Sequence, residues 1–115
     1  MIRTDNIETF KGVQYRVVRG YPDYLVSEYG VIIHKEKGFV RTMDSPDGYR
    51  YALLTDSSGR KSQVPVHRFV ATAWLRNPTR KTSILHLDGN TSNNVLSNIR
   101  WATDREILKH STHSL

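Results

Sequence analysis

The pattern of apolar and polar positions divides the chain into a first half of short strands and a second half that begins with a helix. Alternating segments occur near residues 15–18, 24–33, 39–43, 49–54 and 61–66, and Gly, Pro and Asp turn signals separate them. Strands of this length and spacing predict a small antiparallel sheet over residues 15–65. Residues 1–14 show weak patterning, and we expect them to form an N-terminal tail.

The clearest helix is predicted over residues 66–75. An apolar stripe at helical spacing runs along it, formed by Phe69, Val70, Ala73 and Trp74. Pro78 disfavours helical backbone at Asn77 and should end the segment. Trp74 and the later Trp101 both lie in apolar patterns, so we expect the two indoles to be largely buried and close together in a shared core.

Residues 83–110 combine a short apolar segment, a polar turn, a return segment and a second helix. Residues 83–85 lead into His86, and the Asp-Gly-Asn run at 88–90 is a strong turn signal. After the return segment 98–101, Thr103 and Glu106 form a capping box that should start a helix running to about His110. The pattern predicts a ββα unit with a histidine at its mouth.

These elements predict one α+β protein made of a small N-terminal antiparallel sheet, a central helix and a C-terminal ββα unit. Residues 66–110 would hold the helix and the ββα unit, and residues 111–115 would form a frayed C-terminal tail. A length of 115 residues suits a single domain or two small lobes that share a core. The absence of cysteine excludes disulfides and a cysteine-based zinc ribbon.

The net charge of +6 is placed unevenly along the chain. Residues 1–56 carry eight basic and eight acidic side chains, whereas residues 57–115 carry nine basic and three acidic ones. A basic half that also holds a polar, histidine-bearing motif favours nucleic acid as the partner, although a basic surface also serves plain solubility. No apolar signal region follows Met1 and no run approaches the ~20 apolar residues of a membrane span, so we expect a cytoplasmic protein without a membrane partner.

The ββα segment is similar to the active-site motif of phage and intron-encoded HNH homing endonucleases, which belong to the ββα-metal superfamily. The matching residues are His86, Asp88-Gly89-Asn90, Asn93-Asn94 and Asn98-Ile99-Arg100-Trp101. The resemblance extends upstream through the GYPDYLVSEYGVI run at residues 20–32 and Val66-His67-Arg68, so it covers about residues 15–110. It implies that His86 deprotonates the water that attacks a DNA phosphodiester, that Asn98 orients His86, and that Mg²⁺ or another divalent cation clamps the phosphate.

Two positions depart from the family pattern. The residue before the histidine is usually a carboxylate or amide that holds the metal, and here it is Leu85; the second ligand, an asparagine or histidine on the helix, is here Ile107. Hydrocarbon side chains cannot coordinate a hard cation. We therefore expect no bound cofactor, and candidate replacement ligands in an active site would be Asp88, Asp104 and His110. His67 is a weaker candidate ligand, because a histidine there more often braces the helix.

Double-stranded DNA is the expected partner. The candidate DNA-binding residues are Arg50, Arg68, Arg76, Arg80, Lys81 and Arg100. Tyr49 and Tyr51 could face DNA or lie in the core. Family members often continue into a helix-turn-helix region that reads sequence, and we expect this shorter chain to have less of that capacity.

Three functions remain open at this stage. The first is a phage-encoded DNA-binding protein of the HNH family whose catalysis is lost or impaired through Leu85 and Ile107. The second is an active metal-dependent endonuclease or nickase. The third is an HNH scaffold reused to bind and regulate or inhibit a host protein. Each would act in the cytoplasm of the host cell if the gene is phage-encoded.

Overall fold

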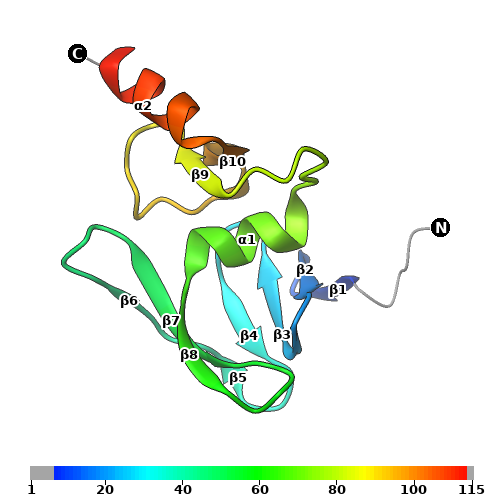
Figure 1. Cartoon of the computed structure of the whole chain (residues 1–115). Coiled ribbons are helices and arrows are strands. Elements are labelled where there is room, and N and C mark those ends of the chain that lie inside the picture. Colours follow the sequence, from blue (N-terminus) through cyan, green and yellow to red (C-terminus); the bar gives the residue numbers. More distant parts are fainter. Residues whose placement is uncertain (1–6, 114–115) are drawn as a thin grey trace.

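The computed structural model describes residues 7–113, and three antiparallel sheets and two helices make up the fold (Figure 1). The first sheet has the order β1-β2-β3-β4-β5 and consists of β1 (Ile7–Phe10), β2 (Val13–Val18), β3 (Tyr21–Ser27), β4 (Ile32–His34) and β5 (Gly38–Phe39). The second has the order β6-β7-β8 and consists of β6 (Thr42–Asp44), β7 (Arg50–Thr55) and β8 (Lys61–Pro65). The third is the hairpin of β9 (Ser83–His86) and β10 (Ile99–Ala102).

The helix α1 (Val66–Trp74) is the centre of the core, as Figure 1 shows by its place between the two larger sheets and the β9–β10 hairpin. It contacts β2 and β3 of the first sheet, β7 and β8 of the second, and both strands of the hairpin. Its buried face includes Phe69 and Val70, which lie among Val26, Ile32 and Leu54. Full burial of one such side chain contributes roughly 1.5–3 kcal/mol to the stability of the fold. Because α1 contacts all three sheets, it joins them into one core.

The expected α+β architecture is confirmed, with an N-terminal antiparallel region, two helices and a C-terminal β-hairpin followed by the helix α2 (Asp104–His113). The predicted single sheet over residues 15–65 is instead two sheets. The chain leaves the first sheet after Phe39, and the half-buried side chain of Val40 packs on the core before β6 begins the second sheet.

The expected N-terminal tail over residues 1–14 is wrong from Ile7 onward. Strand β1 pairs with β2 in a hairpin, with Ile7 opposite Arg16 and Phe10 opposite Val13. The turn between them uses positive φ at Lys11 and Gly12, and glycine adopts such backbone at little cost. Residues 1–6 lie outside the described part.

The C-terminal helix is longer than the sequence predicted. It begins at the expected capping box, in which the Glu106 amide donates to Thr103 Oγ1 over 3.1 Å and the Thr103 amide donates to Glu106 Oε1 over 3.0 Å. It continues to His113 rather than ending near His110, so the expected tail over 111–115 is helical through residue 113. Residues 114–115 are outside the described range. Neither helix within residues 7–113 is long and apolar enough to cross a lipid bilayer.

The two tryptophans are half-buried rather than enclosed, contrary to expectation. The Trp74 indole donates a 3.0 Å hydrogen bond to the Val26 carbonyl, and the Arg16 guanidinium lies 4.4 Å from the ring centroid. The Arg68 guanidinium lies 5.7 Å from the Trp101 ring centroid. Each indole therefore packs on the core by one side and meets a cation, because a ring face attracts a guanidinium.

Candidate functional site

The hairpin β9–β10 places His86 at the end of a buried strand, opposite Ile99. His86 is only 5% exposed, and its Nε2 lies 3.0 Å from Asn94 Oδ1. Because an amide oxygen only accepts, the neutral imidazole carries its proton on Nε2 and leaves Nδ1 unprotonated. This tautomer has the nitrogen lone pair that a general base needs.

The role of Asn98 differs from the one that the family resemblance implied. Its side chain holds the turn: Oδ1 accepts from the Asp88 amide over 3.0 Å, and Nδ2 donates to Asp88 Oδ1 and to the Asn93 carbonyl, each over 2.9 Å. Asn94, not Asn98, is the amide that meets the ring of His86. The reason is local, because Asn98 ends the short 3₁₀ helix at Leu96–Asn98, and its side chain is directed toward the turn at residues 88–90.

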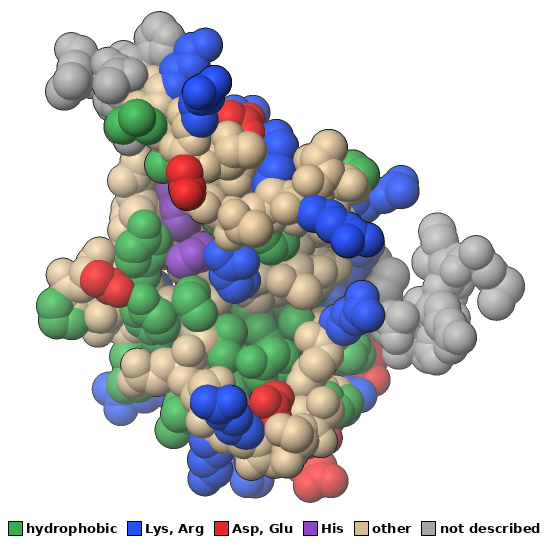
Figure 2. All heavy atoms as spheres, viewed as in Figure 1, with side chains coloured by type: hydrophobic (Ala, Val, Ile, Leu, Met, Phe, Trp, Pro, Cys, Tyr) green, Lys and Arg blue, Asp and Glu red, His purple; other side chains and the backbone are tan. Residues whose placement is uncertain are grey.

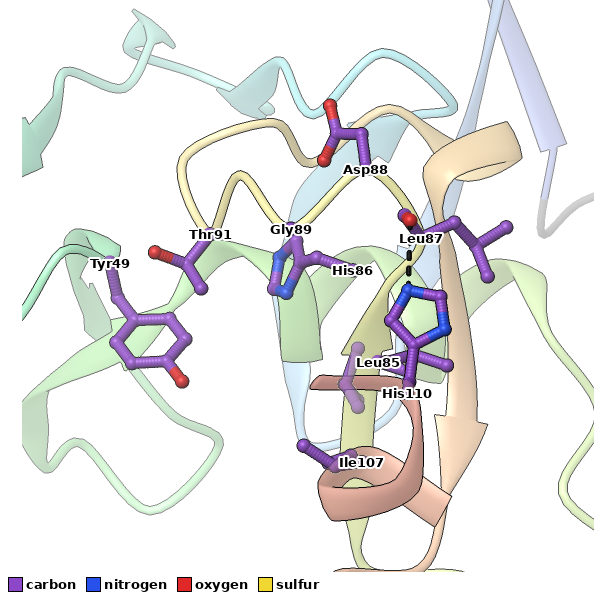
Figure 3. Close-up of a pocket in the computed structure, with 10 residues that line it drawn as sticks. Tyr49, Leu85, His86, Leu87, Asp88, Gly89, Thr91, Ile107 and His110 are labelled. Carbon is purple, nitrogen blue, oxygen red and sulfur yellow. Dashed lines mark hydrogen bonds between the residues drawn. The ribbon is translucent and has the colours of Figure 1, made fainter. Parts of the chain in front are cut away.

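Asp88 is fully engaged within this turn. Its carboxylate accepts from Asn93 Nδ2 over 2.9 Å, from the Asn90 amide over 2.7 Å and from Asn98. These bonds, with the Asn93 side chain first, lower the pKa of Asp88 below its usual value. Figure 3 shows the carboxylate on the side of the turn away from Ile107. Asp88 therefore stabilises the loop that presents His86.

A cleft of about 290 Å³ opens beside His86. It lies between the end of β9, helix α2 and Tyr49, which follows the turn between β6 and β7 (Figure 3). Leu85, which is buried, and Ile107, which is half-buried, line its apolar part together with Ile84 and Leu87. Leu85 and Ile107 thus line the same cleft as the histidine.

The candidate replacement ligands behave differently from one another. His110 lines the cleft, and its Nε2 lies 3.0 Å from the Leu87 carbonyl, to which it donates. Asp104 instead accepts a 2.5 Å hydrogen bond from Ser83 Oγ. Across residues 7–113 no three His, Asp or Glu side chains form a group that could hold a metal ion. With Leu85 and Ile107 in the wall, the donor set does not fit a hard divalent cation.

His67 lies next to the site and contacts Tyr49 and His86 through its ring. Its ring centroid lies 5.1 Å from that of Tyr49 and 5.1 Å from that of His86, and the Tyr49 and His86 centroids are 6.2 Å apart. Figure 2 shows histidine side chains in a hollow between the region of the β6–β7 hairpin and α2. Burial, followed by the nearby His86 and Arg68, lowers the pKa of His67 to about 4. His67 is therefore neutral near pH 7.

This lowered pKa predicts a loss of stability in mild acid. An unfolded chain would protonate His67 near pH 6.5, whereas the folded protein resists protonation down to about pH 4. Stability is full above pH 6.5 and falls as the pH drops toward 4, by about 2 kcal/mol of the free energy of unfolding at pH 5. Urea unfolding at pH 7, 6 and 5 measures this loss. His67→Phe keeps an aromatic ring at this position but cannot be protonated, so the variant should lose about 2 kcal/mol less stability between pH 7 and pH 5. Equal losses in the two proteins would show that His67 is not the group responsible.

Three of the candidate DNA-binding side chains are held by other groups of the protein. The Arg50 guanidinium pairs with Asp44 over 2.9 Å, and Arg68 donates to the Thr82 carbonyl over 2.7 Å. Lys81 Nζ lies 2.8 Å from Glu106 Oε1. The carboxylates offset the charge of Arg50 and Lys81, whereas Arg68 keeps its full charge and is only held in position by the carbonyl.

The remaining candidates Arg76, Arg80 and Arg100 are exposed. Arg76 and Arg100 line one depression together with Lys81. Figure 2 shows basic side chains gathered over the region where Figure 1 places α2 and the connection from α1 to β9. The structure thus brings Arg76, Lys81 and Arg100 together and leaves Arg50 on the separate β6–β7–β8 sheet.

Comparison with known proteins identifies the family. No family model matches the chain. The sequence is 31% identical over 96 residues to the DNA endonuclease I-HmuI of Bacillus phage SP01, covering 81% of this chain and 54% of that protein. It is 28% identical over 89 residues to an HNH endonuclease of Acanthamoeba polyphaga mimivirus, covering 76% of this chain and 27% of the relative.

A solved structure that describes DNA binding and cleavage by the HNH homing endonuclease I-HmuI matches the fold. The TM-score is 0.78 with 26% sequence identity, over 87% of this chain and 58% of that chain. The protein therefore belongs to the HNH homing endonuclease family. It spans between about a quarter and a half of the length of the two relatives named above.

Proposed function

We propose that this protein binds double-stranded DNA on an HNH scaffold and that its cleavage activity is lost or strongly impaired. The observation that supports the proposal is that Leu85 and Ile107 line the cleft at His86, at the positions where the family resemblance implies oxygen or nitrogen ligands. In this proposal His86 would still serve as the base, and Asn94, which lies 3.0 Å from its ring nitrogen, would orient it. The groups that would hold a cation would be missing.

The chemistry explains why a retained base is insufficient. His86 Nδ1 can take a proton from water, but a base does not stabilise the charge that builds on the phosphate and on the leaving oxygen. In metal-dependent nucleases a divalent cation supplies that stabilisation, which is worth several kcal/mol. Because each ~1.4 kcal/mol changes a rate tenfold, its loss costs orders of magnitude. An apolar wall also solvates a bare cation poorly.

DNA binding is supported by two independent features. I-HmuI, whose structure this fold matches, binds and cleaves DNA. In this chain the excess of basic residues falls within residues 57–115, the half that forms α1, the hairpin and α2. Lysine and arginine contacts to phosphates bind DNA of any sequence and release counterions, which makes the affinity depend on salt.

Fluorescence anisotropy of a labelled duplex, measured over a range of salt concentrations, tests this function. The expected affinity falls steeply with salt, with a log–log slope of about 0.9 for each phosphate contacted, and varies little among duplex sequences. The protein should bind the duplex equally well in buffer without divalent cation, because the proposal places no metal between protein and DNA. Absence of binding to long duplexes at low salt would reject the proposal and favour a protein partner.

A further inference from the structure

A second depression, of about 300 Å³, lies between the loop that follows α1 and the strand β10. We call it the notch, and its charged and aromatic lining residues are Arg76, Lys81, Arg100 and Trp101. Three cations around one small hollow repel one another unless an anion lies among them. The notch therefore has the charge of an anion site.

The loop that forms one wall of the notch is held rigidly. Asn77 Nδ2 donates to the Lys81 carbonyl over 2.7 Å, and the Lys81 amide donates to Asn77 Oδ1 over 2.9 Å. The Arg80 amide donates to the Asn77 carbonyl over 3.1 Å, and Arg80 takes a positive φ of 54°. This closed loop fixes the backbone of Lys81, which lowers the entropic cost of binding there.

The opposite wall contains a polar group that lacks a partner. The Trp101 indole Nε1 is shielded from solvent and has no hydrogen-bond acceptor among the described residues. A buried indole N–H normally finds an acceptor, and Trp74 does so at the Val26 carbonyl. Trp101 also lines the notch, so an anion bound there would lie beside this residue.

Glu106 already presents an anion to this region. Its carboxylate lies 2.8 Å from Lys81 Nζ and accepts the Thr103 amide over 3.0 Å. The Lys81 contact, followed by the Thr103 amide, lowers the pKa of Glu106 to about 2. Glu106 is thus ionised at any ordinary pH and neutralises Lys81 in the free protein.

The notch connects to the cleft at His86 through shared side chains. Arg100 lines both the notch and a neighbouring depression on α2, which Glu106 and His110 also line. His110 in turn lines the cleft at His86. The three depressions are therefore neighbours, and a DNA strand that passes His86 would cross α2 to reach the notch.

We propose that the notch binds a phosphate of the DNA backbone, and that this phosphate displaces the Glu106 carboxylate from Lys81. The inference rests on the proposed DNA binding and adds where one strand lies and which internal anion competes with it. In the free protein the Glu106 carboxylate is paired with Lys81, and in the complex the phosphate contacts Lys81, Arg76 and Arg100 and lies beside Trp101.

Glu106→Gln tests the competition. Glutamine keeps the acceptor for the Thr103 amide, because the capping box accepts either residue, while it removes the charge that holds Lys81. Duplex affinity should rise on the order of fivefold, because Lys81 no longer has to leave the Glu106 carboxylate, and the salt slope should stay the same because the phosphate contacts Lys81 in both complexes. Asp104→Asn is the matched control, with the same charge change in the same helical turn, and it should raise the affinity clearly less, because Asp104 does not hold Lys81. Equal effects of the two variants would overturn the competition.

Trp101 tests occupancy of the notch. Trp74→Phe leaves Trp101 as the remaining indole of the chain, and its emission should change on titration with a short duplex. Adding Arg100→Gln to that variant should weaken binding and reduce the emission change. Duplex binding with Trp101 emission unchanged at saturation would reject the notch while leaving the proposed function intact. Failure of the unmodified protein to bind any duplex would reject the proposed function itself.

Discussion

The double variant Leu85→Asp with Ile107→Asn is expected to gain divalent-cation binding and to nick plasmid DNA at least about a hundredfold faster than the unmodified protein. Both positions face the cleft at His86, so the two changes place a carboxylate and an amide beside a base that is already in its reactive tautomer. Hard cations prefer such oxygen ligands. A regained stabilisation of several kcal/mol corresponds to a rate gain of this size or more.

Calorimetric titration with Mn²⁺ and a nicking assay in Mg²⁺ or Mn²⁺ measure the two gains. Leu85→Ala with Ile107→Ala is the matched control, since it opens the cleft without adding ligands and should neither bind metal nor nick. Leu85 is buried, so the unfolding transition of each variant must be measured to show that it is folded. A folded double variant that binds Mn²⁺ but nicks no faster than the control would show that His86 is not in place to act as base.

Charge reversal at Arg76 and Arg80 should lower affinity for every duplex at least tenfold at low salt. Both side chains are exposed near the notch, on the connection between α1 and β9. Losing two phosphate contacts should also reduce the log–log salt slope by about 1.8. Because phosphate contacts carry no sequence information, the loss should be alike for unrelated duplexes.

The matched control is charge reversal at Arg19 and Arg41, two exposed arginines in the half of the chain that forms the first two sheets. The overall change of charge is identical, so any general electrostatic loss will appear in both proteins. Anisotropy titrations at several salt concentrations compare them. If the two double variants lose affinity and slope equally, DNA does not lie on the face that carries α2 and the loop before β9.

Much of the ββα unit could be predicted because its signals are local. The turn at 88–90 and the capping box of Thr103 and Glu106 each fix backbone within a few residues, and both occur where the sequence placed them. The helix at 66–75 was also found, ending at Trp74 in the structure. Its apolar stripe is dictated by helical periodicity.

The surroundings of His86 could not be predicted because they come from distant parts of the chain. Tyr49 follows the β6–β7 turn and His67 lies in the first turn of α1, and only the tertiary fold brings their rings into contact with His86. The motif did contain Asn94, but sequence spacing alone does not tell which of several amides reaches the imidazole. The shape of the loop decides that Asn94 meets the ring and Asn98 holds the turn.

Charge was predictable in amount but not in availability. The sequence placed the basic excess in residues 57–115. In the structure, however, Arg68 donates a hydrogen bond to the Thr82 carbonyl and Lys81 forms an ion pair with Glu106. Side-chain pairing of this kind depends on which elements pack together. It distinguishes the arginines that are exposed on the surface from those that brace the fold.

The most direct test of the central claim is a plasmid nicking assay on the unmodified protein in Mg²⁺ and in Mn²⁺, run beside His86→Ala. We expect the duplex to be bound and strand breaks to stay at the level of the His86→Ala protein with either cation. Rapid nicking that His86→Ala abolishes would contradict the proposed loss of cleavage. In that case the site would hold its cation through other groups at the cleft, with His110 and Asp88 as the first ligands to replace.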